Sequence, residues 1–220
     1  EEQLENDGEV SDSIMKKIIA NDLFGISIPK NYGGLGLSMK EQILLTFEFT
    51  RASAVYRSRF STTIGLCSQA LLDFGTDKQK DKYLPLMASG KTVGSFALTE
   101  PNAGSDALSL ETTAKKDGEE YIINGTKKYI TNAPYADVFL VMAKTNPDIE
   151  GSEGISSFLV DSNSNGIEIG ETPKMLGQKG AASPEVYFQD CRINKDALLG
   201  EKEGGGLKPA LRGINHARLH

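Results

Sequence analysis

The sequence of 220 residues has no tryptophan, two cysteines and two histidines. Cys67 and Cys191 form no CxxC motif, so the sequence indicates neither a disulfide framework nor a thiolate zinc site, and a reducing compartment is expected. No apolar run approaches the length of a membrane-spanning helix, and the acidic beginning EEQLENDGEV does not resemble a signal or transit peptide. The formal charge of −6, with no basic block, argues against broad binding of nucleic acid or of anionic membranes.

Three motifs that would carry chemistry are incomplete. His216 and His220 have the spacing of a two-histidine metal pair, but no HExxH glutamate accompanies them, so we expect exposed histidines and no metal site. Ser105 lies in AGSDA and not in a GxSxG elbow, which leaves a serine-hydrolase triad without support. The glycines of ISIPKNYGGLGLS match neither GxGxxG nor GxxxxGK[ST], so we interpret residues 26–38 as a surface loop.

Helical periodicity dominates the first 90 residues. It predicts four helices, at residues 13–25, 39–53, 60–74 and 77–90. Ser38 and Glu41 have the spacing of a capping box for the second helix, and Thr76 can cap the fourth. Four apolar side chains of the second helix are expected to face a core: Ile43, Leu44, Phe47 and Phe49.

From Thr92 the apolar period changes to two, which predicts eight short strands at residues 93–99, 112–116, 119–123, 127–131, 138–144, 156–160, 167–171 and 185–189. Asp117-Gly118 and Asn124-Gly125 both have the composition of two-residue hairpin turns. We therefore expect an α+β protein, with an N-terminal helical domain (1–91) and an antiparallel β-barrel or sandwich (92–204). Residues 205–220 begin another helix without a stop signal, so we expect a truncated C-terminal helical domain.

A turn of small residues follows the first expected strand, in the stretch FALTEPNAGSD. Successive backbone N–H groups in such a turn form a nest that suits a phosphate. Thr99 and Thr131 end strands on either side, and each hydroxyl can donate to a flat ligand. These features indicate a nucleotide-cofactor cradle without naming the cofactor. We expect Asp106 to cap the turn, and Lys127 and Lys128 to lie on a solvated face.

Two segments resemble the paired flavin-binding signature of the acyl-CoA dehydrogenase family: FALTEPNAGSD at residues 96–106 and NGTKKYITNA at residues 124–133. Three further segments resemble other parts of that family: GISIPKNYGGLGLS (25–38), FGTDKQKDKYLPLMASG (74–90) and the stretch from KMLGQKG to EGGGLK (174–208). The resemblance covers residues 13–220 in order. It implies an N-terminal helical domain, a middle β-barrel domain and a C-terminal helical bundle, of which this sequence supplies the first two and the opening of the third.

The resemblance implies an FAD-dependent acyl-CoA dehydrogenase, which oxidises an acyl-CoA thioester to the trans-2-enoyl-CoA. In this family a glutamate removes the α-proton and the β-hydride passes to flavin N5. The expected partners are an acyl-CoA substrate, an electron-transfer flavoprotein as acceptor, and further copies of the chain in a dimer or tetramer; the expected location is the cytoplasm, or the mitochondrial matrix in a eukaryote. An acyl-CoA oxidase or flavin monooxygenase of the same fold, and a non-catalytic binding module, stay open as alternatives.

Matching the family's motifs position by position implies a set of cofactor-binding residues: Phe96, Leu98 and Thr99 at the isoalloxazine, Gly104 and Ser105 at the pyrophosphate, and Tyr129, Ile130 and Thr131 over the flavin face away from substrate. The implied substrate contacts are Ser105, Asn215 and Arg218. Tyr129 stands where the family often has tryptophan, and Asn215 where it usually has aspartate. Ala217 occupies the place where some members have the catalytic glutamate, so no catalytic residue is named. The base is expected beyond His220, and the chain alone is expected to be inactive.

Overall fold

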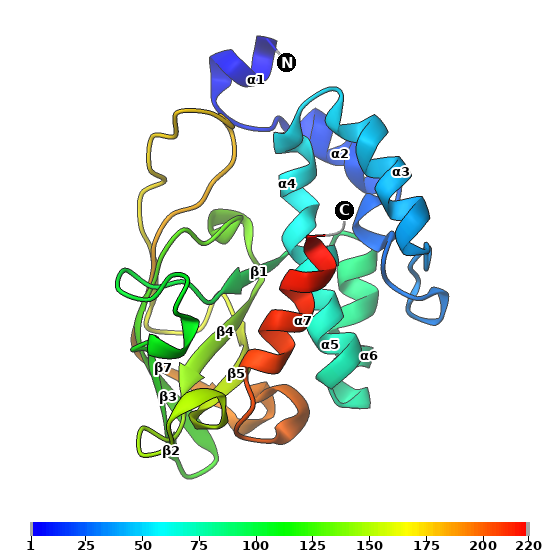
Figure 1. Cartoon of the computed structure of the whole chain (residues 1–220). Coiled ribbons are helices and arrows are strands. Elements are labelled where there is room, and N and C mark those ends of the chain that lie inside the picture. The colour runs from blue at the N-terminus through cyan, green and yellow to red at the C-terminus, as the bar shows by residue number, and fades with distance from the viewer. Residues whose placement is uncertain (1, 219–220) are drawn as a thin grey trace.

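Residues 2–218 are described by the computed structural model, in which helices cover one face of a curled β-sheet (Figure 1). The helices are α1 (Glu2–Asp7), α2 (Asp12–Ala20), α3 (Met39–Thr50), α4 (Ala54–Thr62), α5 (Ser68–Phe74), α6 (Asp77–Ala88) and α7 (Leu207–Ala217). The strands are β1 (Gly94–Ala97), β2 (Thr113–Asp117), β3 (Glu120–Lys127), β4 (Val138–Lys144), β5 (Ile155–Asp161), β6 (Ile167–Ile169) and β7 (Val186–Asn194). None of the described helices is long and apolar enough to cross a membrane.

Two helices begin at capping boxes, and both begin where the sequence predicts. At α3 the hydroxyl of Ser38 accepts from the N–H of Glu41, and the Glu41 carboxylate accepts from the N–H of Ser38 at 2.7 Å. At α6, Thr76 and Gln79 form the same reciprocal pair. Each box satisfies two N–H groups that the first turn of a helix leaves without partners.

The predicted helix at 60–74 is longer and less regular than expected. It begins at Ala54, because the hydroxyl of Ser53 accepts from the N–H of Val55 and caps the first turn. A π-helical segment, Thr63–Cys67, joins α4 to α5, and α7 packs against this segment and against α5. The hydroxyl of Thr63 accepts from the N–H of Gly94 at 3.0 Å, so the π-helical turn is attached to the start of β1. Such turns are frequent at functional sites.

The expected core face of α3 is partly wrong. Leu44 and Phe47 are 56% and 65% exposed, while Leu45 and Phe49 pack against the core formed with α2 and α4. The ring of Phe49 meets that of Phe60 edge-on at 5.5 Å between centroids. The sequence of α3 has apolar residues on two adjacent stripes, and only packing against α4 decides which stripe is buried. Leu44, together with Leu45 and Phe49, lines an apolar groove of about 750 Å³ between α2 and α3.

The sheet is mixed and mostly antiparallel, as the barrel or sandwich prediction requires. Its order is β1-β4-β2-β3-β7-β6, and β5 pairs with the other edge of β4. The β1–β4 and β2–β4 pairs are parallel, and the β2–β3, β3–β7, β4–β5 and β6–β7 pairs are antiparallel. Helices precede the strands and α7 follows them, in the order expected; the domain limits at residues 91 and 204 remain predictions.

Strand β4 is buried on both faces, which explains its continuous apolar sequence VFLVMA. Successive side chains of a strand point to opposite faces. One set contributes to the core under the helices: Val138, Leu140 and Met142. The other set contributes to the core inside the curled sheet: Phe139, Val141 and Ala143. β4 therefore carries both cores and fixes the helical layer against the sheet.

The hairpin predicted at Asn124-Gly125 is wrong, because β3 continues through both residues. The irregularity lies opposite: the register against β7 shifts by one between Ile123 and Gly125, and Asp190 of β7 takes φ +47°. Gly125 itself has φ +152°, and a Cβ there would lie 2.7 Å from the Cα of Thr112. Gly125 therefore permits a close approach of two backbone segments. The turn predicted at Asp117-Gly118 is confirmed, because it joins β2 to β3. Residues 128–131, predicted as a strand, leave the sheet.

We expect Gly125→Ala to lower the free energy of unfolding by about 3 kcal/mol, because the added Cβ meets the backbone of Thr112 in a strained conformation. The matched control is Gly118→Ala, where φ is +62° and no atom lies within 4 Å of the new Cβ; its expected cost is about 1 kcal/mol. Urea unfolding followed by circular dichroism measures both. Equal losses would contradict the close approach at Gly125.

Candidate functional site

The two signature segments lie side by side, as the cradle hypothesis requires. The N–H of Lys128 donates to the carbonyl of Thr99 at 2.7 Å. The hydroxyl of Ser95 donates to the carbonyl of Thr131 at 2.6 Å. Residues 95–99 are thus joined to residues 128–131 by hydrogen bonds at both ends, with Thr99 beside Lys128 and Thr131 beside Ser95. We call these two segments together the ridge.

A third segment, residues 182–184, completes this ridge and was not expected from the sequence. The N–H of Ile130 donates to the carbonyl of Pro184 at 2.9 Å, and the N–H of Asn132 donates to that of Ala182 at 2.8 Å. Between them, the hydroxyls of Thr131 and Ser183 are 3.1 Å apart. Ser183 therefore helps to orient the Thr131 hydroxyl. Its polar side chain in an otherwise irregular stretch gave no signal for this role.

Tyr129 is the most unusual residue of the ridge. Its φ is +59°, and its side chain is 59% exposed. A bulky residue in the left-handed region costs about 1–2 kcal/mol, so surrounding interactions must hold it there. The hydrogen bonds of its neighbours Lys128 and Ile130 do so, and the Lys128 ammonium lies 5.3 Å from the ring centroid. A strained, exposed aromatic beside Thr131 is the kind of feature that contacts ligands.

Three other predicted cofactor residues are mainly buried. Leu98 belongs to the core under the helices, with 8% of its surface exposed, and half-buried Phe96 packs against the same core. Ile130 belongs to the core inside the sheet and is 1% exposed. Leu98 and Ile130 can therefore meet a ligand only through their main chain. Their side chains fix the ridge from below.

The predicted phosphate turn is open to solvent. Glu100 and Ala103 exchange backbone hydrogen bonds that start the turn. Gly104 and Ser105 follow and are exposed, and no atom lies within 4 Å of a Cβ built on Gly104. The Asp106 carboxylate accepts from the hydroxyl of Ser109 and forms no capping hydrogen bond with a backbone N–H of the helical turn that follows, so the expected cap is wrong. The backbone at Gly104 is accessible to a ligand.

Beneath the turn lies a buried ion pair, between Lys127 and Glu100, that the sequence analysis missed. Their side chains are 0% and 3% exposed, so the expectation of a solvated Lys127 is wrong. The Lys127 Nζ lies 2.6 Å from Glu100 Oε1 and 3.2 Å from the carbonyl of Leu98. An unbroken strand β3 puts Lys127 on the same face as the buried Tyr121 and Ile123, and the assumed hairpin hid this alternation.

Each member of the pair changes the other's ionisation. Burial lowers the pKa of Lys127 to about 8, although the nearby Glu100 opposes that shift. Burial by itself raises the pKa of Glu100, but Lys127 and hydrogen bonds from Thr112 and Glu111 outweigh it and hold this pKa below its ordinary value of 4.5. Glu100 is therefore ionised near neutral pH, and its carboxylate accepts three hydrogen bonds.

Of the predicted substrate residues, Asn215 lies on α7 and Arg218 is the C-cap of that helix. Asn215 and Arg218 are exposed, and no hydrogen bond identified among residues 2–218 joins either one to Thr99, Ser105 or Thr131. α7 approaches the π-helical segment closely, since a Cβ on Gly213 would lie 3.2 Å from the backbone of Leu66. His220 lies outside the described residues. Within the described part of the chain, no group of three His, Cys, Asp or Glu side chains is arranged to hold a metal ion.

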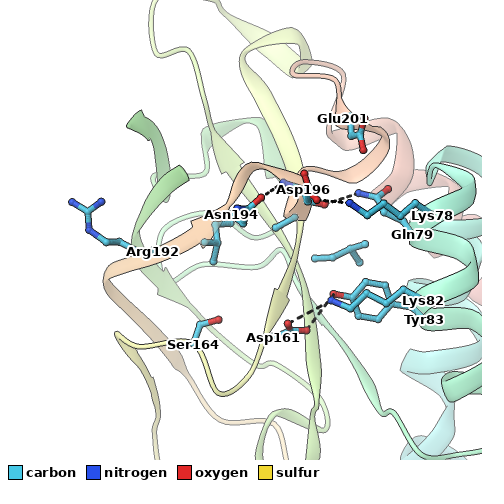
Figure 2. Close-up of a pocket in the computed structure, with 13 residues that line it drawn as sticks. Lys78, Gln79, Lys82, Tyr83, Asp161, Ser164, Arg192, Asn194, Asp196 and Glu201 are labelled. Carbon is cyan, nitrogen blue, oxygen red and sulfur yellow. Dashed lines mark hydrogen bonds and ion pairs between the residues drawn. The ribbon is translucent and has the colours of Figure 1, made fainter. Parts of the chain in front are cut away.

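A separate hollow of about 270 Å³ lies between α6 and strands β5 and β7, and two ion pairs lie in its lining (Figure 2). Lys78 lies 2.6 Å from Asp196, and Lys82 lies 3.7 Å from Asp161. Gln79 donates to the main chain at Asp196 and Leu198. These contacts join α6 to the residues that follow β7. Within each pair the two opposite charges compensate each other.

We expect Glu100→Gln to lower the free energy of unfolding by about 3–5 kcal/mol at pH 7, because it leaves Lys127 buried without its counter-charge. The folded pKa of Glu100 is lower than the unfolded value, so this carboxylate stabilises the fold above pH 4.5 and stops doing so as the pH falls through its folded pKa. The gap between parent and variant should therefore narrow below pH 4.5. Urea unfolding at pH 7, 5 and 3.5 measures it; a gap that widens on acidification would contradict the assignment.

Two family models match the chain: the acyl-CoA dehydrogenase N-terminal domain over residues 1–91 and the acyl-CoA dehydrogenase middle domain over residues 95–191. An acyl-CoA dehydrogenase of Bacillus subtilis is 39% identical over 99% of this chain and 57% of its own length. The CarC subunit of the caffeyl-CoA reductase–Etf complex of Acetobacterium woodii is 37% identical over 99% of this chain and 57% of its own.

The fold is also similar to that of a solved acyl-CoA dehydrogenase structure. A glutaryl-CoA dehydrogenase from Mycobacterium smegmatis, solved in complex with FADH2, superimposes with a TM-score of 0.87 at 30% identity, over 97% of this chain and 53% of that one. This chain therefore spans a little over half the length of the relatives that it matches.

Proposed function

This chain belongs to the acyl-CoA dehydrogenase family, and from that premise we propose that it supplies the FAD cradle and part of the acyl-CoA site of an FAD-dependent acyl-CoA dehydrogenase. The whole protein would convert an acyl-CoA thioester to the trans-2-enoyl-CoA. The observation that best supports this FAD site is the strained, exposed Tyr129 on the segment that lies between Thr131 and the contact with Thr99. When bound, FAD would supply the hydride acceptor.

The described residues fit a flavin. Thr99 and Thr131 would donate to the polar edge of the ring system, and the Tyr129 ring would cover one of its faces. The N–H groups of the open turn at Gly104 and Ser105 would bind the pyrophosphate, as backbone nests do. Donors fixed before the reaction stabilise the negative charge that a flavin gains on reduction. The glutaryl-CoA dehydrogenase solved with FADH2 supports this choice of cofactor.

We further propose that the α-proton base comes from elsewhere in the whole protein. Glu100 adjoins Thr99 but is buried and held by Lys127 and by two backbone N–H groups, so its carboxylate is not presented to a substrate. Asn215 and Arg218 would contact the acyl-CoA from α7. The relative that belongs to an Etf complex supports electron-transfer flavoprotein as the redox partner, and a dimer or tetramer is the proposed assembly.

The reaction is tested by adding acyl-CoA thioesters of several chain lengths anaerobically to the full-length protein and recording the flavin absorbance. Bleaching, followed by reoxidation with electron-transfer flavoprotein, is expected. Reoxidation by oxygen with peroxide release would favour the oxidase alternative. A flavin that no acyl-CoA bleaches would contradict the proposed reaction.

We expect Thr131→Val to raise the Kd of the full-length protein for FAD about tenfold, because one hydrogen bond in a partly enclosed site contributes about 1–1.5 kcal/mol. Thr113→Val is the matched control: Thr113 is an exposed residue of β2, and its replacement should leave the Kd unchanged. Quenching of FAD fluorescence during titration of the apoprotein gives both values. Equal affinities of the two variants would remove Thr131 from the cradle.

A further inference from the structure

The loop that carries Gly104 and Ser105 leaves and returns at the buried pair of Lys127 and Glu100. On the outgoing side, the Lys127 ammonium donates to the carbonyl of Leu98 at 3.2 Å. On the returning side, the Glu100 carboxylate accepts from the N–H of Glu111 at 2.5 Å and from that of Thr112 at 3.1 Å. One ion pair of 2.6 Å therefore closes the neck of the loop.

The neck lies directly against the residues proposed to face the cofactor. Thr99 stands between Leu98 and Glu100, and the residue that follows β3, Lys128, donates to the Thr99 carbonyl at 2.7 Å. The backbone on both sides of Thr99 is thus fixed by consecutive residues 127 and 128. The ion pair therefore contacts the backbone directly beside Thr99 and at the return of the loop.

Burial of the pair is not explained by stability alone. Packed apolar residues of similar volume often stabilise a protein as well as a buried ion pair does, or better. What the pair adds is geometry: an ammonium and a carboxylate with defined partners hold two distant backbone segments in a single arrangement. A preorganised arrangement improves binding because the ligand need not order the loop.

We propose that Lys127 and Glu100 are positioning residues of the cofactor site, which hold Thr99 and the Gly104–Ser105 turn in the arrangement that the ring edge and pyrophosphate of FAD require. This inference rests on the proposed function. Neither side chain touches the cofactor, since both are almost fully buried. Their effect passes through the carbonyl of Leu98 and the N–H groups of residues 111 and 112.

The test is the double variant Glu100→Gln/Lys127→Met of the full-length protein. It removes both charges together, so no buried ion is left unpaired. The amide oxygen of the introduced glutamine can still accept from one of the two N–H groups of the returning side, whereas the introduced methionine cannot donate to the Leu98 carbonyl. We expect a melting temperature close to that of the parent, a Kd for FAD raised at least tenfold, and a bound-flavin spectrum shifted toward that of free FAD.

The matched control is Glu119→Gln/Lys195→Met, which removes an exposed ion pair at the other end of the sheet. It should change neither the melting temperature nor the FAD affinity. A double variant at the buried pair that binds FAD as the parent does would overturn the proposal. If the parent protein itself fails to bind FAD, both the proposed function and this inference are wrong. If the parent binds FAD and the double variant binds it equally well, only this inference is wrong.

Hydrogen exchange of the parent apoprotein keeps the proposal testable if the double variant does not fold. The N–H groups of Glu111 and Thr112 should exchange slowly without cofactor, because the neck is closed in advance. The N–H of Ser105 should become protected only when FAD is added. Fast exchange at residues 111 and 112 in the apoprotein would overturn the proposal, because the neck would then not be held before binding.

Discussion

The buried ion pair between Lys127 and Glu100 is the interaction on which the site depends. Two charges with almost no exposed surface are tolerated only because each has several partners, and those partners lie on segments distant in sequence. The pair thereby joins the end of β3, the end of β1 and the start of β2. Every predicted cofactor residue lies on one of these segments or on a loop that they anchor.

Strain at the ridge is balanced by connections to the helical layer. Asn132 takes φ +65°, and its side-chain amide donates to the carbonyl of Ser58 at 2.7 Å and to the hydroxyl of Thr62 at 2.9 Å. The left-handed residue Asn132 is therefore attached to α4. The π-helical turn after α4 is attached to β1 in the same region through Thr63. Hydrogen bonds to the helices and to the sheet therefore both hold the ridge in place.

Local signals in the sequence were sufficient for much of the fold. The capping box at Ser38 and the cap at Thr76 involve residues within one helical turn, so the sequence alone predicts them. The two segments that end in Thr99 and Thr131, expected on either side of a cradle, do lie side by side. The errors arose where tertiary packing decides. The buried stripe of α3 depends on α4, and glycine at 125 serves a close approach that a dipeptide pattern cannot distinguish from a turn.

The central claim is that this ridge binds FAD, and the absorption spectrum of the full-length protein tests it most directly. The protein is incubated with FAD, desalted, and scanned across the flavin bands. We expect the flavin to be retained, with bands shifted from those of free FAD, because Tyr129, Thr99 and Thr131 change its surroundings. Complete loss of flavin on desalting, with no shift at saturating FAD, would contradict it.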